Sequence, residues 1–155
     1  AVLPWLPEGR LLDVGTGPGL PGIPIALAQP NRAVTLLESN GKKVRFLRQV
    51  CLEMRLDNIA VIASRLEDYR ADERFDGVIC RAFTDATSFL HGVERLLRPH
   101  ASALAMKGRV QPEELAGIEQ AGVSYRWQPL LVPGLDAERH LLIMTGLAPA
   151  AGSSV

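Results

Sequence analysis

Residues 13–19 (DVGTGPG) have the types and spacing to bind a nucleotide-like ligand. Glycine has no Cβ and accepts positive φ, so the backbone of such a turn can approach a ligand closely. If a helix follows, its unpaired N–H groups favour an anionic group at the turn. Gly17, Gly19 and Gly22 also match G-x-G-x-x-G. That pattern alone does not separate a dinucleotide pyrophosphate from the carboxylate of S-adenosylmethionine, or either from a turn that merely needs glycines.

Two acidic residues add information about the ligand. Asp13 stands directly before the glycines, where its carboxylate can accept a hydrogen bond from the ammonium group of S-adenosylmethionine, directly or through water. Glu38 ends the second predicted strand, where a carboxylate can accept both hydroxyls of a ribose. A dinucleotide requires the same acid, so Glu38 indicates a nucleoside cofactor without naming it.

A third acidic segment, residues 64–69 (SRLEDY), follows the third predicted strand. Glu67 can accept a hydrogen bond from an adenine amino group there while Leu66 packs on the ring, and Asp68 is less well placed. The alternative is an ordinary solvated helix start, because acidic residues at that position suit the helix dipole.

These residues all lie at the ends of predicted strands. Apolar runs predict seven strands, at residues 10–14, 33–37, 59–63, 75–80, 101–106, 125–132 and 139–145. Helical patterns occur at residues 20–29, 41–56, 86–97 and 112–121.

The alternation of strands and helices implies crossover units and a mainly parallel sheet with helices on both faces. The last two strands have no helix between them, which predicts an antiparallel hairpin at the sheet edge. Such a hairpin is typical of the methyltransferase version of the Rossmann-like α/β fold. We predict one domain over residues 1–147 and a flexible tail over residues 148–155 (APAAGSSV).

The bulk composition fits one folded, cytoplasmic domain. The chain has 155 residues, 47% of them hydrophobic, and no apolar run long enough to cross a bilayer. Two cysteines, Cys51 and Cys80, make neither a disulfide framework nor a zinc cluster. The net charge of zero neither predicts nor excludes a nucleic-acid partner. Because the chain opens without methionine and soon reaches a buried-type strand, we expect that an N-terminal segment is missing.

Several longer segments resemble the bacterial small-subunit rRNA guanine-N7 methyltransferases, the RsmG or GidB family. They follow the family's order and spacing from about residue 5 to residue 145. The segments are LLDVGTGPGLPGIPIALAQP, TLLESNGKKVRFLRQVCLEMRLDNI, SRLEDY, FDGVICRAF, AMKG and LDAERHLLIM. The resemblance implies methyl transfer from S-adenosylmethionine to N7 of one guanine in 16S rRNA. The expected partner is 16S rRNA or the small ribosomal subunit, and the expected state is a monomer.

The resemblance also implies roles for single residues. Gly15 and Leu20 would line the donor pocket, and Arg81 would contact the donor near the transfer site. Two positions depart from the common pattern: the family often has serine at Cys80, and either Asp or Glu serves at Glu38. With the residues argued above, the expected cofactor-binding set is Asp13, Gly15, Gly17, Gly19, Leu20, Glu38, Leu66, Glu67 and Arg81.

Guanine N7 carries a lone pair and no proton, so the reaction needs no general base. Catalysis would come from holding N7 near the methyl carbon and from a site shaped for the moving positive charge. Arg81 and Lys107 are the candidate catalytic residues, and neither is assigned with certainty. They end the fourth and fifth predicted strands and could meet the cofactor carboxylate, guanine O6 or RNA phosphates. For Lys107 a solvated strand-end cation is an equal alternative.

One helix has two distinct sides at about 100° per residue. Its apolar side consists of Val44, Leu47, Cys51 and Met54, flanked by Phe46 and Val50. Its basic side predicts contacts with RNA phosphates, with an ordinary solvated face as the alternative. The predicted RNA-binding residues are Lys42, Arg45, Arg48 and Lys107.

Other features predict less. Trp5, Tyr69 and Trp127 are scattered, so no stacking platform for RNA is expected. The three histidines lack metal-ligand spacing, so no metal is predicted. Three alternatives stay open: a methyltransferase acting on a small molecule or protein, a dinucleotide-dependent oxidoreductase, and a non-catalytic nucleotide-binding or RNA-binding domain. Asp13 and the terminal hairpin oppose the oxidoreductase.

Overall fold

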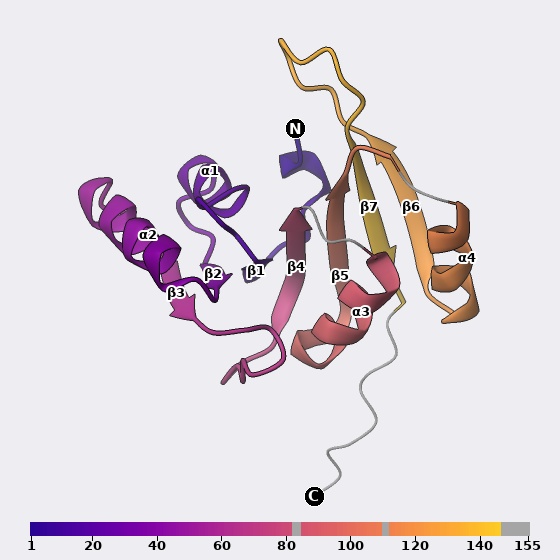
Figure 1. The fold of residues 1–155 in the computed structure, drawn as a ribbon, viewed down its shortest axis with the longest axis horizontal. Helices are drawn as coiled ribbons and strands as arrows, with labels where there is room; N and C mark the ends of the chain where they lie inside the picture. Colours follow the sequence, from indigo (N-terminus) through magenta and orange to yellow (C-terminus); the bar gives the residue numbers. More distant parts are fainter. Residues whose placement is uncertain (82–84, 110–111, 147–155) are drawn as a thin grey trace, which may run out of the picture.

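A seven-stranded sheet in the order β3-β2-β1-β4-β5-β7-β6 forms the centre of the computed structural model, which describes residues 1–81, 85–109 and 112–146 (Figure 1). The strands are β1 (Leu11–Val14), β2 (Val34–Glu38), β3 (Ile59–Ala63), β4 (Phe75–Arg81), β5 (Leu97–Lys107), β6 (Ser124–Pro129) and β7 (His140–Thr145). The first five run parallel, and β7 is antiparallel to both β5 and β6. The predicted Rossmann-like α/β fold with a terminal antiparallel hairpin is confirmed.

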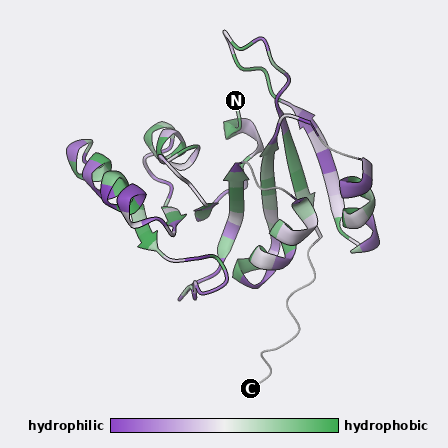
Figure 2. Cartoon of the chain, viewed as in Figure 1, coloured by the Kyte–Doolittle hydropathy of each residue, from purple (hydrophilic) through white to green (hydrophobic). Residues whose placement is uncertain are grey.

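The helices cover the sheet in two layers. They are α1 (Gly22–Ala28), α2 (Gly41–Glu53), α3 (Ala86–Val93) and α4 (Pro112–Gln120), with 3-10 turns at Leu3–Trp5 and Glu94–Leu96. On one face α1 and α2 pack with Leu11 and Leu36, and on the other α3 and α4 pack with Phe75. Figure 2 shows the resulting pattern, with hydrophobic central strands and helices of mixed hydropathy. The continuous apolar runs of the sequence therefore correspond to strands covered on both faces.

Capping side chains fix where two helices begin. Asn40 Oδ1 accepts hydrogen bonds from the backbone N–H of Lys42 (3.0 Å) and Lys43 (3.2 Å), which starts α2 two residues after β2. Asp85 Oδ2 accepts from Ser88 N at 2.7 Å and starts α3. Such caps satisfy N–H groups that have no partner within the helix.

Several boundaries differ from the sequence prediction. The helix expected over residues 86–97 ends at Val93, because Leu97 pairs with the buried Phe75 and already belongs to β5. The strand expected over residues 125–132 ends at Pro129, beyond which the chain enters the loop before β7. The helix expected from residue 20 starts at Gly22, since the preceding residues form turns.

The predicted apolar side of α2 is only partly buried. Val44 and Leu47 are buried, whereas Cys51 is half-buried and both Phe46 and Met54 are exposed. The helix covers β2 and β3, and β3 is the edge strand, so its last turn has no further strand to pack on. The apolar side predicted for this helix is therefore covered at Val44 and Leu47 and largely uncovered at Cys51 and Met54. The basic side is exposed as predicted, at Lys42, Arg45 and Arg48.

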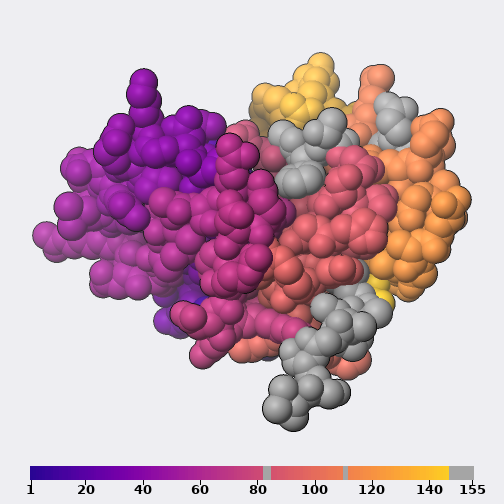
Figure 3. Space-filling model, turned by 60° about the horizontal axis from the view of Figure 1, so that its bottom comes forward, coloured from indigo at the N-terminus to yellow at the C-terminus, as the bar shows by residue number. Residues whose placement is uncertain are grey.

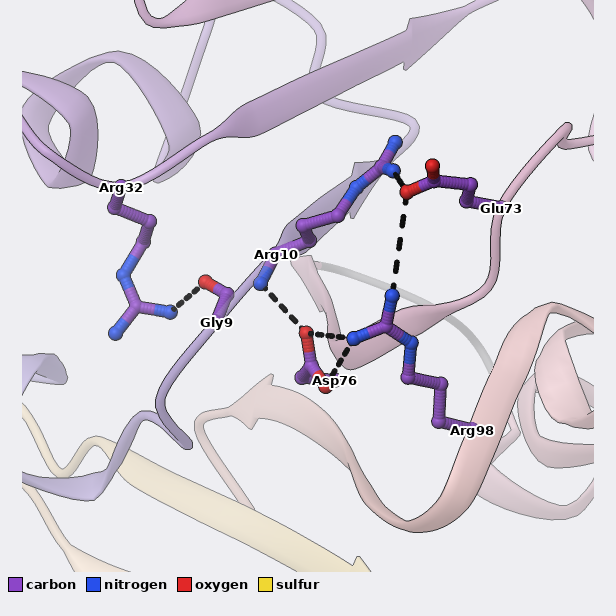
Figure 4. Close-up of polar contacts among 6 residues, drawn as sticks. All are labelled: Gly9, Arg10, Arg32, Glu73, Asp76 and Arg98. Carbon is purple, nitrogen blue, oxygen red and sulfur yellow. Dashed lines mark hydrogen bonds and ion pairs between the residues drawn. The ribbon is translucent and has the colours of Figure 1, made fainter.

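A cluster of charged groups joins the amino ends of the parallel strands (Figure 4). Asp76, in β4, accepts hydrogen bonds from the backbone N–H of Arg10 at 2.8 Å and from the guanidinium of Arg98 at 3.0 Å. Further contacts extend the cluster to the start of β2 and to the loop before β4. The residues drawn are Gly9, Arg10, Arg32, Glu73, Asp76 and Arg98.

Among the described residues no helix is both long and apolar enough to cross a membrane, and no group of three His, Cys, Asp or Glu side chains could hold a metal ion. Cys51 and Cys80 form no disulfide with each other. The tail predicted at residues 148–155 lies outside the described residues.

Candidate active site

The carboxyl ends of the parallel strands bring the predicted site residues to one edge of the sheet. The register pairs Val14, at the end of β1, with Leu37 of β2 and Cys80 of β4. It also places Glu38 beside Ala63, so the segment after β3 begins next to that carboxylate. Ligands of open α/β sheets bind at this edge, where the strand order reverses between β1 and β4.

The glycines of the first turn have different environments. Gly15, Gly17 and Gly19 have φ of +64°, +60° and +95°, which L side chains rarely adopt. A Cβ added at Gly15 would meet no atom within 4 Å, whereas one at Gly19 would lie 2.3 Å from Ile23 Cδ1. A side chain at Gly19 would therefore have to displace Ile23 of α1, whereas Gly15 and Gly17 leave backbone open to a ligand.

Asp13 stabilises this turn through hydrogen bonds. Its side chain is fully buried, and its Oδ2 accepts hydrogen bonds from Thr16 Oγ1 at 2.6 Å and from Gly22 N at 2.8 Å. Oδ1 is also buried, and the described part of the chain offers it no hydrogen-bond partner. The sequence predicted Asp13 as a cofactor contact and did not indicate Thr16. The only signal for the bond between them was that Thr16 lies three residues after Asp13.

Burial raises the pKa of Asp13 from 3.8 to about 6, against the opposing effects of the hydrogen bonds from Thr16 and Gly22 and of the charge of Arg81. A raised carboxyl pKa means that the folded state holds the proton more tightly than the unfolded state. The associated stability is complete below the unfolded pKa and is lost as the pH rises through the folded value.

Asp13→Asn should remove this pH dependence. We subtract the unfolding free energy of Asp13→Asn from that of the wild type. This difference should fall as the pH rises from about 4 to about 7. Urea denaturation of both proteins across that range measures the difference. Two curves that stay parallel would show that Asp13 has an ordinary pKa.

Glu38 links the glycine turn to α2. The residue is 7% exposed, and its two oxygens accept hydrogen bonds from Gly17 N and Asn40 N, each at 2.9 Å. Both oxygens keep lone pairs that can accept from hydroxyl groups. The bonds hold the carboxylate in one orientation in the lining of a pocket of about 280 Å³. Four predicted residues line that pocket together: Gly15, Glu38, Leu66 and Glu67.

The segment after β3 is held by a residue that the sequence did not indicate. Arg95 donates to the carbonyl oxygens of Leu66 (2.5 Å) and Tyr69 (2.7 Å). Leu66 is half-buried against the α3 layer, while Glu67 is exposed and lies 3.8 Å from Arg65 in an ion pair. Arg95 thus presents Leu66 and Glu67 to the pocket, although it lies far from them in the sequence.

The two candidate catalytic cations have different surroundings. Arg81 is exposed at the end of β4, near enough to the glycine turn for its charge to lower the pKa of Asp13. The Lys107 side chain is only 8% exposed and forms an ion pair with Glu114, which is 9% exposed. Glu114 also accepts a hydrogen bond from Ala86 N at 2.6 Å. Lys107 is therefore not the solvated strand-end cation of the alternative prediction, and a contact with RNA phosphates would compete with this ion pair.

The other predicted residues do not line this pocket, including Asp13, Gly17, Gly19 and Arg81. Leu20 is 39% exposed in the turn before α1 and does not line it. The basic residues of α2 are exposed and do not line the pocket, although their helix starts three residues after Glu38. They are Lys42, Arg45 and Arg48.

Several solved structures with a similar fold are named as methyltransferases. A methyltransferase from Pyrococcus furiosus aligns with a TM-score of 0.73 at 16% identity, over 93% of this chain and 78% of that one. A SAM-dependent methyltransferase from Aquifex aeolicus aligns with a TM-score of 0.68 at 19% identity, over 90% of this chain and 84% of that one. At such identities the likeness establishes the fold alone.

Relatives with higher identity define the family. The chain is 46% identical over 151 residues to the ribosomal RNA small subunit methyltransferase G of Alkalilimnicola ehrlichii, covering 97% of this chain and 69% of that protein. It is 45% identical over 143 residues to the protein of the same name from Escherichia fergusonii, covering 92% and 69%. The family model described as rRNA small subunit methyltransferase G matches residues 1–142. The chain therefore belongs to the rRNA small subunit methyltransferase G family.

Proposed function

We propose that this chain transfers a methyl group from S-adenosylmethionine to N7 of a specific guanine in 16S rRNA. The observation that carries the proposal is the pocket in which Gly15, Glu38 and Leu66 meet, in a member of a family named for rRNA methylation. The chain acts in the cytoplasm as a monomer, on 16S rRNA or the small ribosomal subunit, without a metal ion.

The residues present fit the cofactor. Open space above Gly15 and Gly17 accepts the part of the ligand that must approach the backbone, and the Glu38 oxygens can accept the ribose hydroxyls. Leu66 offers an apolar contact to adenine, and Glu67 can accept from its amino group. When bound there, S-adenosylmethionine supplies a methyl group activated on a sulfonium.

The chain's own task is to position the acceptor. Guanine N7 has a lone pair and carries no proton, so no side chain needs to act as a base. Arg81, exposed beside the glycine turn, can donate to guanine O6 or to the methionine carboxylate and so fix the approach of N7 to the methyl carbon. Asp13 acts as a positioning residue, because its bonds to Thr16 and Gly22 set the shape of the turn.

The basic face of α2 is the proposed contact for RNA phosphates. Its three exposed cations begin two residues after the helix cap, so they approach the pocket from the side of Glu38. Cations of this kind supply affinity and register on RNA and not base specificity. They are Lys42, Arg45 and Arg48.

Calorimetric titration with S-adenosylmethionine and with NAD tests the cofactor class. We expect micromolar binding of S-adenosylmethionine, about −8 kcal/mol, no binding of NAD, and clearly weaker binding by Glu38→Ala. Glu53→Ala, an exposed acid at the other end of α2, is the control and should bind like the wild type. Binding of NAD, or of neither ligand, would overturn the proposal.

Methyl transfer to small subunits that lack the modification tests the substrate. We expect incorporation of one labelled methyl group, located at guanine N7. Tight cofactor binding without transfer to any ribosomal substrate would favour a non-catalytic RNA-binding domain instead.

A further inference from the structure

Two rings stack on the face of the terminal hairpin that α4 partly covers. Trp127 of β6 and His140 of β7 lie nearly parallel, with ring centroids 4.4 Å apart and an interplanar angle of 14°. Both residues are half-buried, because β6 is the edge strand of the sheet and no further strand lies beside it. In the sequence Trp127 counts only as a scattered aromatic residue. The register pairs Pro129 with His140, and this brings His140 diagonally opposite Trp127, which the sequence did not indicate.

A pocket of about 600 Å³ opens over these rings. Tyr125, on the same face of β6 as Trp127, extends the aromatic surface, and its hydroxyl donates to Glu119 at 2.9 Å. Leu115, from the first turn of α4, forms an apolar wall. Arg109 and Glu138 also line the pocket, and both are exposed. An aromatic floor with one cation and one carboxylate at its rim is suited to a flat ring with polar edges that carries a negative group.

The pocket lies at the carboxyl ends of the parallel strands, as the cofactor pocket does. His140 pairs with Lys107, the last residue of β5, and with Pro129, the last residue of β6. Its Nδ1 lies 3.0 Å from the carbonyl oxygen of Gly108, which ties the start of β7 to the end of β5. In Figure 1 the loop between β6 and β7 (gold) projects beyond the carboxyl ends of the parallel strands, and in Figure 3 the same segment protrudes at the top of the molecule.

We propose that this pocket binds one nucleotide of single-stranded RNA next to the residue being methylated. The base stacks on the Trp127–His140 pair, Arg109 contacts a phosphate, and Glu138 accepts a hydrogen bond from an amino or imino group of the base. The inference rests on the proposed function, because it assumes an RNA substrate at this edge. Stacking on aromatic side chains and Arg contacts to phosphate are general ways of binding unpaired RNA.

Tryptophan fluorescence tests the stacking directly, since the chain has only two tryptophans. In Trp5→Phe, Trp127 is the only tryptophan, and we expect a single-stranded RNA hexamer of adenylates to quench its emission. In Trp127→Phe the remaining Trp5 lies under Arg126, 4.8 Å from the ring centroid, and should not be quenched. Quenching of Trp5 and not of Trp127 would overturn the proposal.

Affinity measurements separate this inference from the proposed function. Trp127→Leu should weaken binding of the hexamer about tenfold and leave the affinity for S-adenosylmethionine unchanged, which also shows that the variant is folded. Arg109→Gln, at an exposed position, should lower the slope of log affinity against log salt by about one. If the wild type neither binds nor methylates RNA, the proposed function fails. If it does both and Trp127→Leu and Arg109→Gln behave like it, only the nucleotide pocket is wrong.

Discussion

Replacing Glu114 by alanine is expected to lower the free energy of unfolding by about 3–5 kcal/mol. The Glu114 carboxylate is the partner of the buried Lys107 ammonium and accepts the hydrogen bond of Ala86 N. Its removal leaves a charge and an N–H group without these acceptors in a site that water barely reaches. Because the three residues come from α4, β5 and α3, all three elements should loosen together. Urea denaturation measures the loss.

Two comparisons make this prediction specific. Glu67→Ala breaks an ion pair with Arg65 in which the side chains are 68% and 72% exposed, and it should cost less than about 1 kcal/mol. The double variant Lys107→Met/Glu114→Leu removes both charges, so it should be more stable than Glu114→Ala alone. If Glu114→Ala loses no more stability than Glu67→Ala, the buried ion pair contributes no more to the free energy of unfolding than an exposed one.

Gly15→Ala is expected to weaken binding of S-adenosylmethionine roughly 30-fold or more, about 2 kcal/mol. A methyl group at this position points into space that no atom of the described chain occupies within 4 Å, so it meets the ligand and not the protein. The positive φ of +64° adds backbone strain of about 1 kcal/mol, which lowers stability but does not act on the ligand. Calorimetry measures the binding, and urea denaturation measures the strain.

Gly122→Ala is the matched control for that substitution. Gly122 has φ of +70° and equally open surroundings, but it lies in the turn between α4 and β6, away from the pocket. It should lose as much stability as Gly15→Ala and bind the cofactor normally. Equal binding by both variants would mean that the cofactor does not approach the first turn at Gly15.

The sequence was most informative where burial or local geometry decides the structure. Apolar runs such as residues 33–37 predicted strands because parallel strands are covered on both faces. The positions of Gly15 and Glu38 predicted a shared ligand site, since Gly15 follows the first strand and Glu38 ends the second, and both line one pocket. Residues 97–100 were expected to be helix and loop, yet they extend β5 because Leu97 pairs with Phe75 across the sheet.

The sequence was least informative about contacts between distant side chains. Lys107 reads as a strand-end cation, and only the fold shows that α4 brings Glu114 to it. Arg95 gives no sign that it holds the carbonyl groups of Leu66 and Tyr69. The stack of Trp127 on His140 depends on the register of the hairpin, which strand patterns do not specify to one residue.

The charged cluster around Asp76 has a consequence for how this protein can change. It fastens the amino ends of the strands through side chains such as Arg10 and Arg98, which lie at the edge away from the pocket. The opposite edge carries the turns that meet ligands. Substitutions in those turns can alter recognition while the strands stay aligned, because the strand pairing and this cluster hold the strands outside the turns. Maintenance of the architecture and choice of ligand are thus assigned to opposite ends of the same strands, and each can vary with little damage to the other.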